Sequence, residues 1–281
     1  MKQLLINVFG INTLYAVRKS RLINFFPRLW LAMRFHTARL RQIFGWLFTS
    51  REDTNFTYNL TPDNKLYLAN MISAISGASV EVIQNLFREV ETDDMLRQHI
   101  LTKTRAAPYR IVADNRVEFG RRLGWYALVR LLKPGVVIET GVDKGLGAVL
   151  LCSALLRNRA EGKPGRYFGT DIALKAGYLL SEQYAEVGQI LYGDSIESLQ
   201  QFTEPIDLFI NDSDHSANYE YDEYETIISK LAPMGIILGD NAHVTSKLAQ
   251  FSGKYNRRFL YFQEVPQDHW YPGAGIGFSF I

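Results

Sequence analysis

From residue 135 onward, short apolar runs alternate with helical segments, and this alternation constrains the fold more than any other feature of the chain. Five apolar runs predict strands, at 136–139, 167–172, 189–192, 206–211 and 235–239. The segments that follow them predict helices, at 144–158, 174–186, 195–202, 218–231 and 245–252. Continuous apolar runs separated by helices are typical of a parallel sheet with helices on both faces.

The chain ends in two further apolar runs, 258–265 and 276–281, with no helix between them. One of these strands should therefore pair antiparallel with its neighbours. Before the sheet, residues 115–133 predict one amphipathic helix, which a Lys-Pro-Gly sequence ends. Residues 66–100 predict two more amphipathic helices.

Charge divides the chain at residue 51. Residues 1–51 hold nine basic side chains and no acidic one, so the other 230 residues carry 22 basic and 29 acidic side chains. We therefore expect three parts: a basic helical head (1–51), a helical lid or substrate region (52–115) and an α/β domain (116–281).

Within the head, Pro27 favours the start of a helix that runs to about Ser50. One face of this helix is apolar and carries Phe26, Leu29, Trp30, Met33, Leu40, Ile43, Phe44, Leu47 and Phe48. Arginines 28, 34, 39 and 41 flank that face, whereas Leu31, Phe35 and Trp46 interrupt the polar side. Such a helix suits a cap over the active site or on a second subunit of a homo-oligomer. A membrane surface is the next alternative, and the acidic body disfavours nucleic acid.

Cysteine usage and hydropathy exclude several classes of protein. The single cysteine, Cys152, excludes an internal disulfide framework and a Cys-cluster zinc site, and we expect it to pack in the core. The chain has no run of 18 or more apolar residues. Its first 17 residues are largely apolar but lack a small-x-small cleavage pattern. We expect a cytoplasmic protein, with peripheral membrane contact as the alternative.

The first strand ends at Glu139 and is followed by Gly141, Gly145 and Gly147. Ligands of such folds bind at the carboxyl ends of the strands, where glycines permit a tight turn and a close approach. The spacing differs from the G-x-G-x-x-G dinucleotide fingerprint, and an acid would repel a pyrophosphate. The turn favours a cationic or neutral ligand over NAD, with a plain strand-to-helix turn as the alternative.

The next two strands also end in acids. Asp171 is able to accept hydrogen bonds from both hydroxyls of a ribose, and Asp194 with Ser195 would lie near an adenine. Each of them is also a good helix cap, which is the alternative interpretation.

These residues resemble the cofactor elements of class I S-adenosyl-methionine-dependent methyltransferases, over roughly residues 115–281. The resemblance implies a Rossmann-like, doubly wound sheet of seven strands with the last strand inserted antiparallel. It implies that Gly141, Gly145 and Gly147 approach the methionine part of the cofactor. Asp171 would then hold the ribose, and Asp194 and Ser195 the adenine.

Polar residues follow the fourth and fifth strands as well. Asp212, Asp240 and Asn241 offer hard oxygen ligands at neighbouring strand ends, which suits Mg²⁺ or a similar divalent ion. Helix capping is the alternative role of the two aspartates. His215 is the first candidate for a general base and Asp214 the second, while His243 is a candidate for substrate contact.

This pair of strand ends resembles the metal-dependent O-methyltransferases of the catechol and macrocin types, although the catechol enzyme has a lysine at the position of His215. The resemblance implies transfer of a methyl group to a hydroxyl of a small molecule, such as a sugar, a glycolipid or a natural product. A hydroxylase-like enzyme on the same scaffold and a non-catalytic module that binds S-adenosyl-methionine are the alternatives.

Overall fold

The computed structural model describes residues 21, 23–55, 57–240 and 242–281, which form two compact units. The smaller unit comprises the residues up to Ser50 together with Asp268–Trp270, and the larger unit comprises Arg51–Gln267 and Tyr271–Ile281. The predicted lid region, 52–115, thus belongs to the same compact unit as the sheet, and its role as a lid stays a proposal.

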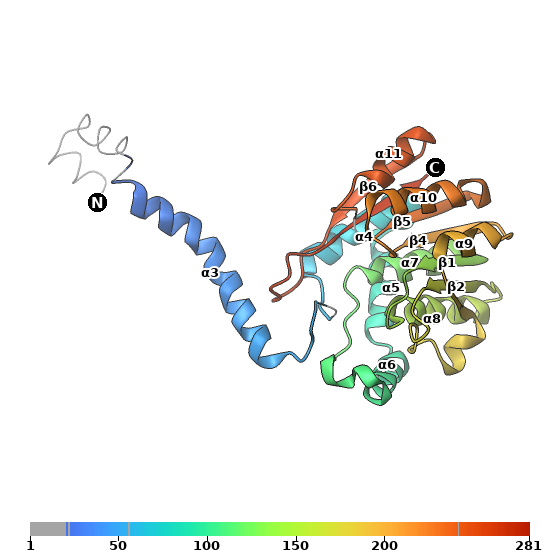
Figure 1. Ribbon diagram of the computed structural model, residues 1–281, viewed down its shortest axis with the longest axis horizontal. Coiled ribbons are helices and arrows are strands. Elements are labelled where there is room, and N and C mark those ends of the chain that lie inside the picture. The colour runs from blue at the N-terminus through green and yellow to red at the C-terminus, as the bar shows by residue number, and fades with distance from the viewer. Residues whose placement is uncertain (1–20, 22, 56, 241) are drawn as a thin grey trace. The chain divides into compact units, whose positions relative to one another are not determined.

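The larger unit is built on one seven-stranded sheet (Figure 1). Its strands are β1 (Val136–Thr140), β2 (Arg166–Asp171), β3 (Gly188–Tyr192), β4 (Ile206–Asn211), β5 (Leu231–Gly239), β6 (Arg258–Gln263) and β7 (Gly275–Phe280). They lie in the order β3-β2-β1-β4-β5-β7-β6, and β1 to β5 pair in parallel. The last strand, β7, lies antiparallel between β5 and β6, which confirms the predicted class of fold.

Helices cover both faces of this sheet. The helices of the larger unit are α4 (Pro62–Ser76), α5 (Val80–Glu91), α6 (Asp94–Ala106), α7 (Arg122–Leu132), α8 (Leu146–Ala160), α9 (Ser195–Gln201), α10 (Ala217–Ile227) and α11 (Lys247–Lys254). The larger unit also contains three short 3-10 helices, η1 (Pro108–Val112), η2 (Glu182–Glu186) and η3 (Ile228–Lys230). The smaller unit contains α3 (Phe25–Thr49).

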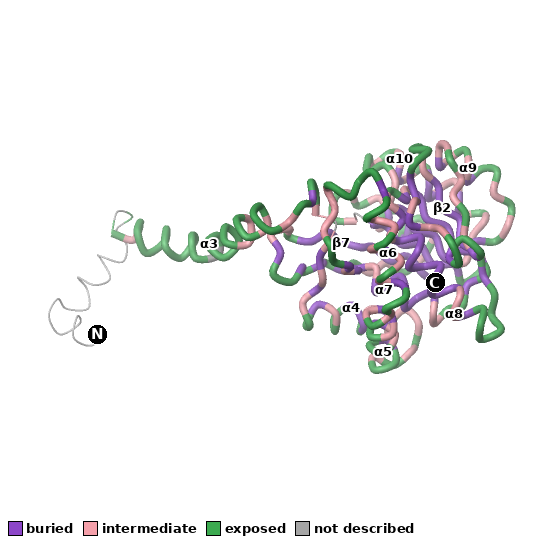
Figure 2. Tube along the Cα trace, turned by 90° about the horizontal axis from the view of Figure 1, so that it is seen from below, coloured by how far each residue is buried: buried purple, intermediate pink, exposed green. Residues whose placement is uncertain are grey.

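The alternation of side chains along each strand divides the core into two layers. Val137 of β1 and Leu208 of β4 pack with α4 to α8, whereas their neighbours Ile138 and Phe209 pack with α9 to α11. Figure 2 shows the buried residues concentrated on the strands between these layers. Cys152 lies buried in α8, as predicted. The sheet is therefore fixed on both faces, and its carboxyl edge is held rigidly.

Three sequence-based expectations for the helices were wrong. Helix α7 begins at Arg122 rather than near residue 115, because Gly120 has a left-handed φ of 51° and the Arg121 amide donates to Glu264 Oε1. Residues 174–186 form turns and η2 instead of a helix. There the amide groups of Gly177 and Leu179 donate to carbonyls of the glycine turn, Asp143 and Lys144, at 2.6 and 3.1 Å. The region 66–100 contains the start of a third helix, α6, which Asp93 caps.

Candidate active site

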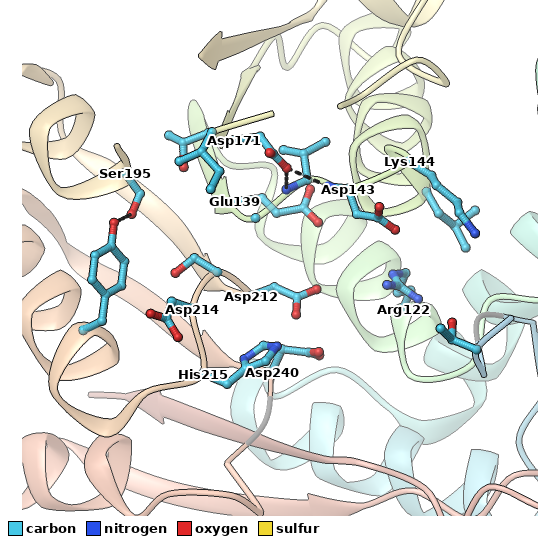
Figure 3. A pocket seen from close by; sticks show the side chains of 18 of the residues that line it. Arg122, Glu139, Asp143, Lys144, Asp171, Ser195, Asp212, Asp214, His215 and Asp240 are labelled. Carbon is cyan, nitrogen blue, oxygen red and sulfur yellow. Dashed lines mark hydrogen bonds between the residues drawn. The ribbon is translucent and has the colours of Figure 1, made fainter. Parts of the chain in front are cut away.

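A cavity of about 790 Å³ opens at the carboxyl ends of β1 to β5 in the larger unit (Figure 3). Nine predicted residues line it: Glu139, Gly141, Asp171, Asp194, Ser195, Asp212, Asp214, His215 and Asp240. Gly145, Gly147 and His243 are not among its lining residues. Asn241 lies outside the described residues. Tertiary folding thus brings most of the predicted residues to one place, as the topology of a parallel sheet requires.

The three glycines of the turn after β1 have different tasks. Gly141 lines the cavity with φ of 78°, and a Cβ atom there would lie 2.1 Å from the backbone oxygen of Asp212. A Cβ on Gly147 would lie 2.1 Å from Glu139 Oε1, and one on Gly145 would lie 3.0 Å from Gly177. All three glycines thus allow close packing, and of the three only Gly141 is among the cavity's lining residues, so the contact of Gly145 and Gly147 with a cofactor stays a prediction.

Glu139 is buried at the end of β1, where the hydroxyl of Tyr167 donates to its Oε2 at 2.5 Å. Burial raises the pKa of Glu139 to about 7. The residue therefore presents a carboxyl group to the cavity that is partly neutral at physiological pH.

Asp171 at the end of β2 holds the glycine turn in place. Its Oδ2 accepts the amides of Val142 and Asp143 at 3.1 and 2.9 Å, and its Oδ1 accepts the amide of Ala173 at 2.8 Å. The neighbouring Thr170 Oγ1 is buried and has no hydrogen-bond partner among the described residues. An unsatisfied buried hydroxyl beside an acid suits a ligand that carries hydroxyl groups.

Asp194 has the capping role that the sequence offered as an alternative, and Asp194 and Ser195 both line the cavity. Asp194 caps α9 by accepting the amide of Glu197 at 3.0 Å, and it also lines the cavity. The hydroxyl of Tyr219 donates to Asp194 Oδ2 at 2.8 Å and lies 2.8 Å from Ser195 Oγ. The backbone hydrogen bond from Glu197 lowers the pKa of Asp194, which stays ionised.

Behind this edge, the buried Glu223 of α10 joins three strand ends, a feature that the sequence did not reveal. Its Oε1 accepts the hydroxyls of Ser195 and Ser213, and its Oε2 accepts Thr140 Oγ1 and Asn211 Nδ2. Burial raises the pKa of Glu223 to about 7.

A count of protons supports the neutral form of Glu223. The hydroxyl hydrogen of Tyr219 goes to Asp194, and in the ionised state that of Ser195 goes to Glu223. The contact between Ser195 Oγ and Tyr219 Oη then lacks a hydrogen. A proton on Glu223 that is donated to Ser195 restores one to each contact, so the network is complete only in the neutral form.

Asp212 and Asp240, at the ends of β4 and β5, both line the cavity (Figure 3). Burial, and next the negative charge of Asp240, raise the pKa of Asp212 well above its ordinary value. Despite its burial, Asp240 has a lowered pKa because the Arg121 guanidinium binds it. Of the two carboxyl groups, Asp212 is therefore the one that holds a proton more readily.

Arg121 is the main site residue that the sequence reasoning missed. Its Nε and Nη2 donate to the two carboxylate oxygens of Asp240, and its Nη1 donates to Tyr58 Oη at 2.7 Å. Glu264 accepts the Arg121 amide at 3.0 Å and the Tyr58 hydroxyl at 2.9 Å. Nothing in the sequence around Arg121 marks it, because its partners lie 63 to 143 residues away.

The described residues do not fit a divalent ion at Asp240. A metal there would stand next to the Arg121 guanidinium, which already occupies both oxygens, and the two cations would repel each other. Among the residues that the structure describes, no group of three or more His, Cys, Asp or Glu side chains is arranged to hold a metal.

Asp214 and His215 lie exposed at the rim of the cavity beside Asp212 (Figure 3). Asp214 Oδ1 accepts the amide of Ser216 at 2.9 Å. His243 has a different task, since its Nδ1 accepts the amide of Gly275 at 3.0 Å and it does not line the cavity. Its predicted contact with substrate therefore has no support from the geometry.

Arg122 adds a cation to this acidic cavity, a feature that the sequence reasoning also missed. Its guanidinium lies over the Trp125 ring, 5.3 Å from the centroid, and its Nε is buried without a hydrogen-bond partner among the described residues. The cavity thus combines acidic walls with one cationic corner.

One protein-family model matches part of this chain, and several solved structures have a similar fold. Residues 138–242 match the family model described as a methyltransferase domain. An O-methyltransferase from Streptomyces achromogenes, involved in tomaymycin synthesis and solved with S-adenosyl-methionine, has a TM-score of 0.52 at 16% identity, over 68% of this chain and 91% of its own. A proposed O-methyltransferase from Klebsiella pneumoniae has a TM-score of 0.51 at 17% identity. The match covers 72% of this chain and 96% of the Klebsiella chain. No curated protein matches the chain.

Proposed function

We propose, from the premise that this chain carries a methyltransferase domain over residues 138–242, that it transfers a methyl group from S-adenosyl-methionine to a hydroxyl oxygen of a small molecule. The observation that carries the proposal is the single cavity into which β1 to β5 all direct their carboxyl ends. Its acidic walls suit a sulfonium cation, and solved structures of similar fold include O-methyltransferases.

The residues of the cavity fit this cofactor in an extended arrangement. Asp171 and the unpartnered Thr170 hydroxyl would receive the ribose hydroxyls, and Asp194 with Ser195 would border the adenine. Gly141, which packs closely against the backbone of Asp212 in the cavity wall, would border the methionine part, and Arg122 would receive its carboxylate. When bound, the cofactor supplies a methyl group on a positively charged sulfur, which an oxygen nucleophile accepts.

The acceptor would enter beside Asp212, where Asp214 and His215 line the rim. Either side chain would take the proton of the acceptor hydroxyl as the new oxygen–carbon bond forms, with His215 as the first choice because a neutral imidazole has a ring nitrogen able to accept a proton. The acids around them disfavour an anionic acceptor. A neutral hydroxylated molecule, such as a sugar, a glycolipid or a natural product, suits this surface better.

For the metal, our proposal departs from the sequence-based prediction. Arg121 supplies at Asp240 the positive charge that Mg²⁺ was expected to supply, so the chemistry here rests on the side chains alone. Arg121 fixes Asp240, whose negative charge in turn raises the pKa of Asp212.

Calorimetry with S-adenosyl-homocysteine, in buffer that contains a chelator, tests the cofactor proposal. We expect binding, and about tenfold weaker binding for Asp171→Asn, because a carboxylate accepts stronger hydrogen bonds than an amide. Asp222→Asn is the matched control, since Asp222 is exposed on α10 and does not line the cavity. Absence of binding would refute the proposal.

An assay for release of S-adenosyl-homocysteine over a panel of hydroxylated small molecules then tests the transfer. Turnover with any of them supports an enzyme. Cofactor binding with no turnover across neutral sugars, glycolipids and phenols would favour the non-catalytic module instead.

A further inference from the structure

Helix α3 of the smaller unit is exposed along most of its length (Figure 2). Many of its exposed side chains are large and apolar. Six large side chains on one face are 44% to 85% exposed, namely Phe26, Leu29, Trp30, Phe44, Leu47 and Phe48. Exposed apolar patches of this kind mark surfaces that a partner covers. Trp46, which interrupts the polar side of the helix, packs edge-on against Trp270 of the same unit. The two ring centroids are 5.3 Å apart.

The charges of α3 decide what kind of partner suits it. The helix contains four arginines and no acidic residue. Arg34 and Arg41 border the apolar face on one side, and Arg28 and Arg39 border it on the other. Two copies of α3 packed face to face would bring these arginines together without any acid on the helix to neutralise them. A surface that is apolar inside and anionic at its edge complements the helix on both counts.

A lipid bilayer with anionic headgroups has this arrangement. Long arginine side chains extend along apolar surface and place their guanidinium groups at phosphates, while aromatic rings such as that of Trp30 favour the boundary between the acyl chains and the headgroups. The arginines recur along 25 residues, so the helix has no uncharged stretch long enough to cross the bilayer. No single helix in the described part of the chain meets the length and hydropathy of a membrane span.

We propose that α3 is an interfacial helix that lies in the surface of an anionic membrane, with its apolar face in the acyl boundary and its arginines at the phosphates. This inference goes beyond the proposed function and does not depend on it. It gives the basic head of the sequence a task that the catalytic cavity does not use.

Co-sedimentation of the full chain with vesicles tests this proposal. The vesicles contain phosphatidylcholine alone or phosphatidylcholine mixed with phosphatidylglycerol. We expect binding to the anionic vesicles that weakens as salt is added, and about tenfold weaker binding for Phe44→Glu, which places a negative charge on the apolar face. Leu31→Glu is the matched control, because Leu31 is 51% exposed on the opposite face of the same helix.

Equal sedimentation of Phe44→Glu and the wild type would overturn the proposal, as would equal binding to both kinds of vesicle. Light scattering without vesicles tests whether a second copy of the chain binds this face instead. A wild-type dimer that Phe44→Glu dissociates, together with no vesicle binding, would assign the face to a second copy and overturn the membrane proposal. Unchanged thermal unfolding of both variants verifies that each one is folded.

Discussion

Replacement of Glu223 by glutamine should remove a pH-dependent loss of stability while every hydrogen bond of Glu223 is kept. A glutamine amide nitrogen at the Oε1 position donates its two hydrogens to the hydroxyls of Ser195 and Ser213. The amide oxygen at the Oε2 position still accepts Thr140 and Asn211. Alanine would instead leave these donors without an acceptor, so Glu223→Gln is the informative change.

The size of the effect follows from the pKa. Burial raises the pKa of Glu223 from 4.5 to about 7, so the folded protein retains a proton that the unfolded chain releases. The stability that the neutral carboxyl contributes is complete below pH 4.5 and is lost as the pH rises through 7. Integrated from pH 5 to pH 8, the loss is about 2.5 kcal/mol in the wild type and absent in Glu223→Gln.

Denaturant unfolding of both proteins at several pH values between 5 and 8 measures this difference. The free energy of unfolding of Glu223→Gln minus that of the wild type should rise steadily with pH, while all other titrating groups cancel. Glu225→Gln on the same helix is the control, because hydrogen bonds from Lys254 and Tyr255 lower the pKa of Glu225 despite partial desolvation and its titration lies below this window. A difference that stays constant from pH 5 to pH 8 would refute the assignment of a neutral buried carboxyl.

Four further outcomes are expected. Addition of a chelator should leave cofactor binding and turnover unchanged, and a loss of turnover that Mg²⁺ restores would contradict the role given to Arg121. Gly141→Ala should destabilise the fold by about 2–4 kcal/mol in denaturant melts, because the new Cβ would meet a backbone oxygen at a residue with positive φ. Gly162→Ala is the control, since Gly162 has a φ of 76° but open space around it, and it should cost only about 1 kcal/mol. Arg122→Gln should weaken S-adenosyl-homocysteine about tenfold in calorimetry, and equal affinity would remove Arg122 from the cofactor site. His215→Ala should lower kcat about a hundredfold in the release assay with a small change in KM, and unchanged kcat would leave Asp214 as the base.

The sheet could be predicted from the sequence because each strand is buried on both faces and so appears as an uninterrupted apolar run. The span 206–211 matches β4 residue for residue, and the other strands differ by a few residues at their ends. The helices were predicted less well where backbone amides found partners outside their own segment. Residues 174–186 have a helical pattern of side chains, but their amides bond to the glycine turn, and no local pattern encodes that choice.

The cavity could be predicted as far as the topology of the sheet dictates it. Acids at the ends of β1 to β5 must converge, because parallel strands in one sheet place their carboxyl ends at one edge. The sequence does not say which groups face those acids from elsewhere in the chain. Arg121 comes from the turn before α7, and its guanidinium binds Asp240, one of the three residues from which the sequence predicted a metal site.

By itself, the sequence determined the class of fold, the edge of the sheet where chemistry takes place and the separation of a basic helix from an acidic body. These properties depend on periodicity, composition and the order of strands, all of which are local or additive along the chain. Only the tertiary structure decided the raised pKa values of Glu223 and Asp212, the partner of Asp240 and the position of His243 away from the cavity lining. Those properties depend on burial and on contacts between distant segments, and the energy of a charge is set by the groups around it in space.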